Sequence, residues 1–282
     1  MSVPTDQMPA ALAPFVLTLG EYDLGPGSGG VHRGLPSTRV TVTIPEEDPL
    51  EIAWVGDPGS GARLRAVVAG LHLGAVELRQ RGCTRGVWLT LSPLGAAALL
   101  GVPAAALAGD IADLTDVAPA LAALPERLAS CRTWPQRRAL VERALLAGLA
   151  RNGARADQGE LRAALAALSR TTRVQEAARL LGCSRRHLSG TVRSELGVTA
   201  KEYQRLVRFE TARSRLVTAA ASGRPALAAV AAASGFTDQA HLTREWRTMT
   251  GHTPAEWLRT EVPTTRSQML KTPQPLAPTM AT

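Results

Sequence analysis

Apolar residues near the C-terminal end of the chain follow the period of short helices. Leu227 and Val230 fall three positions apart on one helix face, and Gly235 then follows as a residue that ends a helix at little cost in the left-handed conformation. After this glycine, Leu242 and Trp246 lie four positions apart, which predicts a second helix with polar residues on its other faces. Two short helices joined by a glycine-containing turn predict a helix-turn-helix.

The sequence also marks the ends of the second helix. Thr237 or Asp238 can cap its first turn, Gly251 ends it, and Pro254 begins a third helix. The amide, hydroxyl and guanidinium groups on its outer faces suit a helix that enters the major groove of DNA.

The same pattern occurs a second time upstream. A helix over residues 174–181 ends at Gly182, and Ser184 caps a second helix that runs to Gly197. The two copies correspond at a distance of about 54 positions, Ala178 with Ala231, Gly182 with Gly235, Leu188 with Leu242 and Gly197 with Gly251. The sequence therefore predicts two helix-turn-helix motifs.

A single continuous helix is predicted between the two copies, over residues 199–218. Its apolar residues recur at spacings of three and four: Tyr203, Leu206, Phe209, Ala212 and Leu216. At 1.5 Å per residue this helix is roughly 28 Å long. That length is close to one turn of B-DNA, about 34 Å, so the two recognition helices could enter successive major grooves.

This part of the chain resembles AraC/XylS-type bacterial transcription regulators. The residues that carry the resemblance are Ala231, Gly235, Phe236, Leu242, Arg244, Trp246, Gly251, Pro254, Trp257 and Arg259. The family more often has Phe at the position of Trp246 and Tyr at that of Trp257, and both exchanges keep a buried aromatic side chain. The resemblance implies a sequence-specific DNA-binding regulator with two helix-turn-helix motifs in one chain.

The resemblance also implies which residues contact DNA. The expected set is Ser184, Arg185, Arg186, Ser189, Gly190, Arg193, Asp238, Gln239, His241, Thr243 and Arg244. Arg186 can pair with guanine, Gln239 with adenine, and Thr243 can meet a thymine methyl group. His241 could donate to guanine or phosphate, or be merely solvated. Backbone contacts or a solvated basic face remain the alternative for the arginines.

Strand-like patterns dominate the first part of the chain, from residue 15 to about 93. Residues 38–44 alternate β-branched side chains, and Gly/Pro clusters at 25–30, 56–61 and 82–86 suggest turns. We expect five to seven strands, largely antiparallel. Helical patterns follow near 94–100, 103–108, 117–129 and 134–150. The fold class is therefore an α+β N-terminal domain, with antiparallel strands followed by helices, joined to an all-α C-terminal DNA-binding domain.

The expected division is a sensor or dimerisation domain at 1–150, a linker at 151–159, the DNA-binding domain at 160–262 and a proline-rich disordered tail at 263–282. Leu35-Pro36, Leu91-Ser92-Pro93 and residues 99–103 resemble an uncharacterised sensory-type domain that often precedes AraC-like domains in actinobacterial proteins. This resemblance does not indicate which ligand, if any, the domain binds. This domain could bind a small effector, a protein partner or a second copy of the chain, and its composition does not decide which.

Charge separates the two halves. The net charge is +8, with 12 Arg and Lys against 14 Asp and Glu in residues 1–150, and 20 against 10 in residues 151–282. Only the second half is therefore expected to meet a polyanion. The partners expected are double-stranded DNA, a small-molecule effector, RNA polymerase and a second copy bound through the N-terminal domain.

The remaining patterns favour a cytoplasmic protein without cofactor or metal. Cys83, Cys131 and Cys183 have no paired spacing, which provides neither a disulfide framework nor a zinc site. Residues 1–12 lack the features of a signal peptide. The uncharged segment 86–109 contains prolines, glycines and many alanines, so a buried strand followed by packed helices is expected there and no membrane span.

An enzyme-like N-terminal domain fused to a DNA-binding module is the alternative function. His32, His72 and Glu77 could form a site in the folded domain, although single histidines in strands are more often structural. Cys83 lacks the sequence context of a nucleophile elbow. We therefore expect no catalytic residues.

Overall fold

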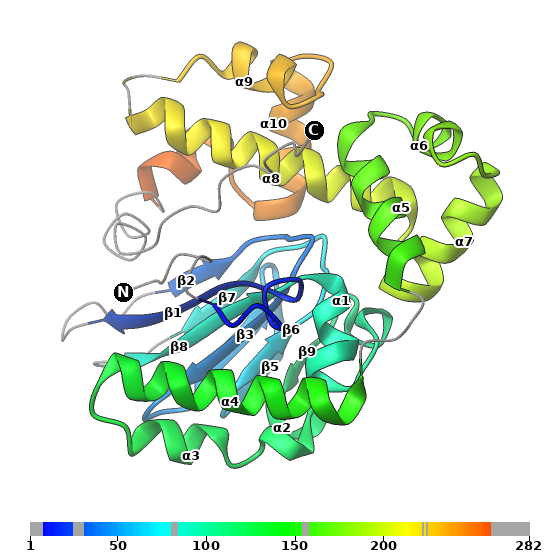
Figure 1. Cartoon of the computed structure of the whole chain (residues 1–282). Coiled ribbons are helices and arrows are strands. Elements are labelled where there is room, and N and C mark those ends of the chain that lie inside the picture. The colour runs from blue at the N-terminus through cyan, green and yellow to red at the C-terminus, as the bar shows by residue number, and fades with distance from the viewer. Residues whose placement is uncertain are drawn as a thin grey trace.

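The computed structural model describes residues 8–24, 31–79, 84–153, 158–221, 223 and 225–260. An α+β part occupies the N-terminal half and a helical part the C-terminal half, which lies over one edge of the sheets (Figure 1). The predicted fold class is confirmed. The expected tail at 263–282 lies outside the described residues.

Two antiparallel sheets form the N-terminal part. The first has the order β1 (Val16–Leu24), β8 (Thr84–Leu91), β3 (Val40–Pro45), β6 (Val67–Ala69) and β9 (Ile111–Asp113). The second has the order β2 (Val31–Gly34), β7 (Val76–Arg79), β4 (Leu50–Trp54) and β5 (Asp57–Leu64). The alternation expected for β3 is present, because Val40, Val42 and Ile44 are buried while the threonines between them are only partly so.

The strand count differs from the expectation of five to seven for residues 15–93, since the described residues of this segment contain eight strands and β9 follows later. One reason is the glycine-rich segment 56–61, predicted as a turn. Only Val55 and Gly56 form the turn there, with Gly56 at φ 85°, and β5 continues through the rest. An edge strand tolerates glycines because it pairs on one side only, and β5 lies at the edge of its sheet.

Six short helices and the longer α4 follow, close to where the periodicity placed helices. They are α1 (Pro93–Gly95), the π-helix η2 (Ala96–Leu100), the 3-10 helix η3 (Ala104–Leu107), α2 (Leu114–Val117), the 3-10 helix η4 (Pro119–Leu121), α3 (Leu124–Ala129) and α4 (Trp134–Asn152). The uncharged segment 86–109 is thus a buried strand followed by packed helices. Among the described residues, no helix combines the length and apolarity needed to cross a bilayer.

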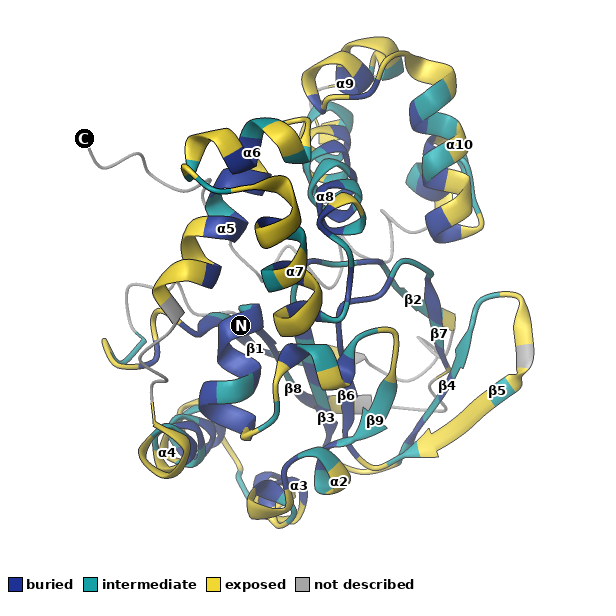
Figure 2. Ribbon diagram, turned by 90° about the vertical axis from the view of Figure 1, so that its right-hand side faces the viewer, coloured by how far each residue is buried: buried dark blue, intermediate teal, exposed yellow. Residues whose placement is uncertain are grey.

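Six named helices form the C-terminal part. They are α5 (Gln158–Arg170), α6 (Val174–Leu180), α7 (Arg185–Leu196), α8 (Ala200–Ala221), α9 (Leu227–Ala233) and α10 (Gln239–Thr250), and residues 254–260 are also helical. The connecting helix α8 has 22 residues and a length of about 33 Å, slightly more than predicted. In Figure 2 α7 and α10 lie on opposite sides of α8.

The two parts of the chain share packing. One hydrophobic cluster extends from the sheet residues Val42 and Leu89 to Leu188 and Val192 of α7. The predicted linker at 151–159 is shorter in the structure, because α4 continues to Asn152 and α5 starts at Gln158. Residues 154–157 lie outside the described part of the chain.

Candidate nucleic-acid interface

The first helix-turn-helix consists of α6 and α7. Gly182 takes φ 66° in the turn between them, a conformation that favours glycine. Ser184 caps α7 as predicted, since its Oγ accepts a hydrogen bond from the His187 N–H at 3.1 Å. Leu188 and Val192 are buried, so the opposite face of α7 is turned outward.

The second helix-turn-helix repeats this geometry with α9 and α10. Gly235 takes φ 77° in the turn, and Asp238 is the cap, because its Oδ1 accepts from the His241 N–H at 2.7 Å. Leu242 and Trp246 are fully buried, as their spacing predicted.

The internal repeat also includes the start of the helix that follows each helix-turn-helix. Thr199 and Glu202 form a capping box at the start of α8, in which each residue bonds to the backbone of the other at 2.7–3.1 Å. Thr253 and Glu256 form the same box at the start of the helical residues 254–260. The T-x-x-E pattern in both places was the signal that could have revealed them.

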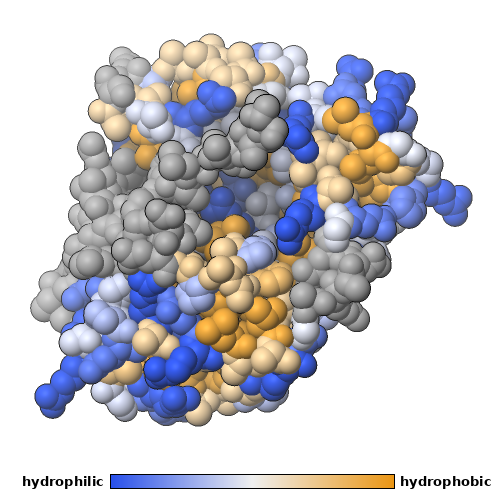
Figure 3. All heavy atoms as spheres, in the orientation of Figure 1, coloured by the Kyte–Doolittle hydropathy of each residue, from blue (hydrophilic) through white to orange (hydrophobic). Residues whose placement is uncertain are grey.

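The predicted contact residues face away from the core of both units. Ser184, Arg185, Arg186, Gly190, Arg193, Asp238, Gln239 and Arg244 are exposed, and Ser189, His241 and Thr243 are partly exposed. Exposed residues follow the outer side of α7 in Figure 2, and strongly hydrophilic side chains project from the α5–α7 unit in Figure 3. The residues between 184 and 193 lie on or next to α7, and those between 238 and 244 lie on or next to α10. The structure therefore brings the predicted contact residues together in two separate groups.

Comparison with known proteins agrees with this geometry. Residues 177–260 match the family model of a helix-turn-helix domain. This segment is an AraC-type DNA-binding domain. No curated protein matches the sequence.

Several solved structures resemble the chain at low sequence identity. ToxT from Vibrio cholerae O395 has a TM-score of 0.48 at 12% identity, over 86% of this chain and 96% of that one. ToxT of strain SCE256, solved with an unsaturated fatty acid bound, has a TM-score of 0.47 at 12% identity, over 85% and 94%. The C-terminal domain of AraT, a response regulator from Geobacillus stearothermophilus, has a TM-score of 0.32 at 21% identity, over 36% and 84%.

His241 of the AraC-type domain is held by its neighbours. Its ring packs edge-on against Phe236, with centroids 5.4 Å apart, and Nδ1 accepts the Thr237 N–H at 3.4 Å. In the neutral ring an accepting Nδ1 leaves the proton on Nε2. This arrangement gives His241 a donor for a base or a phosphate, as its predicted role requires.

Thr243 and Gly190 expose fewer polar groups than most of the other predicted contact residues. The Thr243 hydroxyl donates to the carbonyl of Gln239 at 2.9 Å, one turn earlier, which leaves the methyl group as its apolar contact. A Cβ added to Gly190 would meet nothing within 4 Å. Packing within the protein therefore does not require glycine at this position.

Two contacts that brace the recognition helices were not predicted. Glu160 of α5 accepts from His187 Nε2 at 2.8 Å and from the Thr191 hydroxyl at 3.1 Å, which ties α7 to α5. Arg205 of α8 donates to Glu245 of α10 at 2.9 Å. In both cases the two partners are far apart in the sequence, so no local sequence pattern predicts the contact.

The residues of the enzyme alternative have structural surroundings. His72 is buried with Nδ1 2.5 Å from the Gly74 carbonyl, and Glu77 pairs with Arg33 at 3.1 Å. Burial lowers the pKa of His32. Cys83 lies outside the described residues, within which no group of three or more His, Cys, Asp or Glu could hold a metal.

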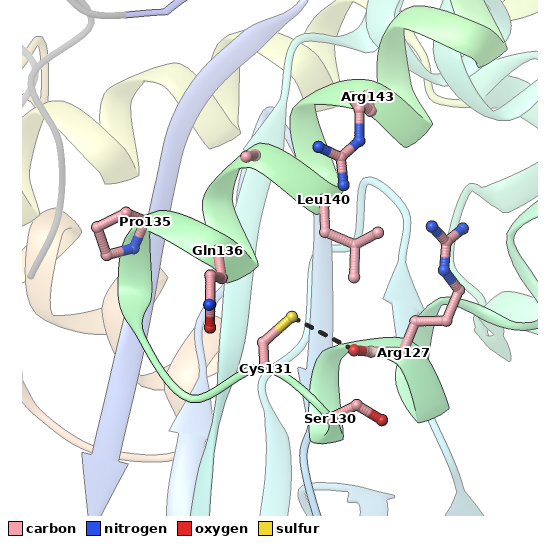
Figure 4. A pocket seen from close by; sticks show the side chains of 8 residues that line it. Arg127, Ser130, Cys131, Pro135, Gln136, Leu140 and Arg143 are labelled. Atoms are coloured by element: carbon pink, nitrogen blue, oxygen red, sulfur yellow. Dashed lines mark hydrogen bonds between the residues drawn. The ribbon is translucent and has the colours of Figure 1, made fainter.

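An open pocket of about 660 Å³ lies between α3 and α4 in the N-terminal part (Figure 4). Its lining is Arg127, Ser130, Cys131, Pro135, Gln136, Ala139, Leu140 and Arg143. The guanidinium groups of Arg127 and Arg143 flank the Leu140 side chain, and the lining contains no carboxylate. This charge favours an anion over a cation.

Proposed function

We propose that the chain is a transcription regulator that binds a two-block DNA site through α7 and α10. The observation that carries the proposal is the duplicated geometry: two capped recognition helices with outward polar faces, joined by one helix of about 33 Å. One turn of B-DNA is about 34 Å long, which suits two successive major grooves on one face of the duplex.

Charge supports the same function. Residues 151–282 carry 20 Arg and Lys against 10 Asp and Glu. Arginines on the outer face of α7 can neutralise phosphates and release counterions, so affinity should fall steeply with salt. In this proposal phosphate contacts position the domain and base contacts select the sequence.

The N-terminal part is proposed as the regulatory half. A second copy of the chain, RNA polymerase and a small effector are its proposed partners, and the cationic α3–α4 pocket would suit an anionic effector. Thermal-shift screening of small carboxylates and phosphates tests that assignment, which fails if no stabilisation depends on Arg143. Because the target is chromosomal DNA, we place the protein in the cytoplasm.

The enzyme alternative receives less support. His72 is bonded to the Gly74 carbonyl and Glu77 is paired with Arg33, while His32 is buried, and such surroundings are typical of structural residues. A regulator without turnover is therefore the proposed class.

Selection from randomised duplex DNA with the full chain tests the proposed function. The expected product is a site with two conserved blocks about ten base pairs apart, one for each recognition helix. An Arg186→Ala, Arg244→Ala double variant serves as the control and should enrich this site poorly. Failure to enrich any sequence, or enrichment of one block only, contradicts the proposal.

A further inference from the structure

The N-terminal part contacts the first helix-turn-helix at the end of its recognition helix. Gly197 ends α7 in the left-handed conformation and lies against η3. A Cβ at Gly197 would lie 2.5 Å from the Cβ of Ala108 and 2.9 Å from the carbonyl oxygen of Ala105. Leu196 and Leu107 belong to the same buried cluster, so this contact is close and apolar.

The N-terminal part also contacts the second helix-turn-helix. Leu35 and Leu73 pack against the cluster built around Trp246 and Trp257. A Cβ at Gly251, where α10 ends, would lie 3.3 Å from Val55. Both recognition helices therefore end against the same N-terminal part, through equivalent glycines of the repeat.

A third contact with the N-terminal part is made by the connecting helix α8. Glu210 is the eleventh of the 22 residues of α8. Its Oε1 accepts from the Ser37 hydroxyl at 2.8 Å and from the Thr38 N–H at 3.1 Å, and its Oε2 accepts from the Thr38 hydroxyl at 2.7 Å. A carboxylate that accepts three hydrogen bonds is held in one orientation.

These contacts hold three points of the DNA-binding domain on one rigid support. The connecting helix α8 packs into both units, since Tyr203 belongs to the first buried cluster and Phe209 to the second. Without further support, bending of α8 would still allow the units to twist relative to each other. The contacts of Gly197, Gly251 and Glu210 with the N-terminal part oppose such motion. Resting on the proposed function, we infer that the N-terminal part fixes the separation of α7 and α10, and that Glu210 is the positioning residue that restricts the operator spacing the protein accepts.

The spacing between the two blocks of the DNA site can be changed directly, by inserting or removing base pairs. Each added base pair moves one block by 3.4 Å and rotates it by about 35° around the helix axis. A rigid pair of recognition helices cannot follow both changes, whereas a pair joined by α8 alone can follow them in part. The central bonds of Glu210 should therefore appear as a penalty for altered spacing.

The experiment measures the affinity of the full chain for its selected site with one base pair inserted or removed between the blocks, at fixed salt. We expect the unaltered chain to lose about tenfold or more per change, comparable to one mismatched base pair. Glu210→Gln and Thr38→Val should lose less than about threefold per change, since the first replaces charge-assisted bonds by neutral ones and the second removes the Thr38 hydroxyl. Affinity for the optimal site should change little in both.

Matched controls separate positioning from general damage. Thr38→Ser keeps the hydroxyl donor and should behave like the unaltered chain. Glu47→Gln makes the same charge change at an exposed residue between β3 and β4 and should also keep the spacing penalty. Thermal unfolding identifies variants that lose the fold. If Glu210→Gln does not fold, Thr38→Val still tests the same contact, because it changes the partner of Glu210.

The outcomes distinguish this inference from the proposed function. If the full chain binds no two-block site, the proposed function fails. If it binds such a site but Glu210→Gln and Thr38→Val keep the full spacing penalty, the packing of α8 onto each unit sets the separation and only the inference is overturned.

Discussion

Gly190 departs most clearly from what a recognition helix should contain. A glycine inside a helix costs about 1 kcal/mol relative to alanine, and the space around this position is open. Gly190→Ala should therefore raise the free energy of unfolding by about 1 kcal/mol, measured by denaturant unfolding. A loss of stability would contradict this reading, and a loss of DNA affinity in the stabilised variant would show that the DNA backbone or a base approaches the helix closely there.

Arg186 tests whether the first recognition helix contacts bases. If its exposed guanidinium pairs with guanine, Arg186→Ala should lower discrimination at one base position by about 1–3 kcal/mol. Arg193→Ala is the comparison, because a phosphate contact should weaken all sequences alike. Affinities for the selected site, a one-base variant and random DNA separate the two results. Equal weakening of all three by Arg186→Ala would mean that Arg186 contacts the backbone.

At the scale of single residues, the sequence predicted the caps and glycines well because their chemistry is local. Ser184 and Asp238 bond to backbone groups three positions away, so the cap is visible in the sequence itself. The brace from Glu160 to His187 joins residues 27 positions apart. Nothing in the local pattern of either residue indicates that partner.

At the scale of elements, the capping boxes give a pH-dependent stability. The N–H of Thr199, together with its hydroxyl, lowers the pKa of Glu202. A carboxylate with a lowered pKa in the folded state stabilises the fold above its unfolded pKa, about 4.3, and this contribution is lost as the pH falls through the folded value. Glu202→Gln should thus destabilise the protein at pH 7 and reduce the loss of stability on acidification.

Thermal unfolding between pH 7 and about pH 3 measures this effect, over the range in which carboxylates titrate. Glu195→Gln is the matched control, since Glu195 is exposed on α7 and takes no part in the capping box. Parallel curves for Glu202→Gln and the unaltered chain would contradict the role of the box.

The elements also show where sequence patterns fail. Helices with caps and an apolar stripe, such as α7 and α10, were predicted with nearly their observed bounds. The sequence predicts a turn over residues 56–61 because glycines usually interrupt strands, yet residues 57–61 belong to β5, which pairs with β4 at a sheet edge. Tertiary pairing of this kind has no counterpart in the local sequence.

At the scale of the whole molecule, the packing of the N-terminal part against the helical part was not predicted. The composition of residues 151–159 suggested a flexible connection. The contacts of Glu210, Gly197 and Gly251 with the N-terminal part involve residues far from that segment. The arrangement of the two parts depends on contacts between elements that are distant in the sequence. Neither the hydropathy pattern nor the residue spacing indicates such contacts.

The two helix-turn-helix units should contribute unequally to sequence selection. On α7 the positions expected to contact bases include Ser189 and Gly190, of which one has a short side chain and the other none. On α10 they include Gln239 and His241, and the His241 ring is oriented with a donor available. Base contacts specify and phosphate contacts position, so α7, with three exposed arginines, should chiefly hold the register.

Selection from randomised DNA should therefore return one block that is more strongly fixed than the other. Gln239→Ala should relax the stronger block while leaving the weaker one unchanged, which assigns the stronger block to α10. Ser189→Ala is the matched change on α7 and should alter neither block noticeably. Equal information in both blocks, or more in the block that responds to α7 variants, would contradict the unequal division and would indicate that Gly190 admits the helix backbone deep into the groove.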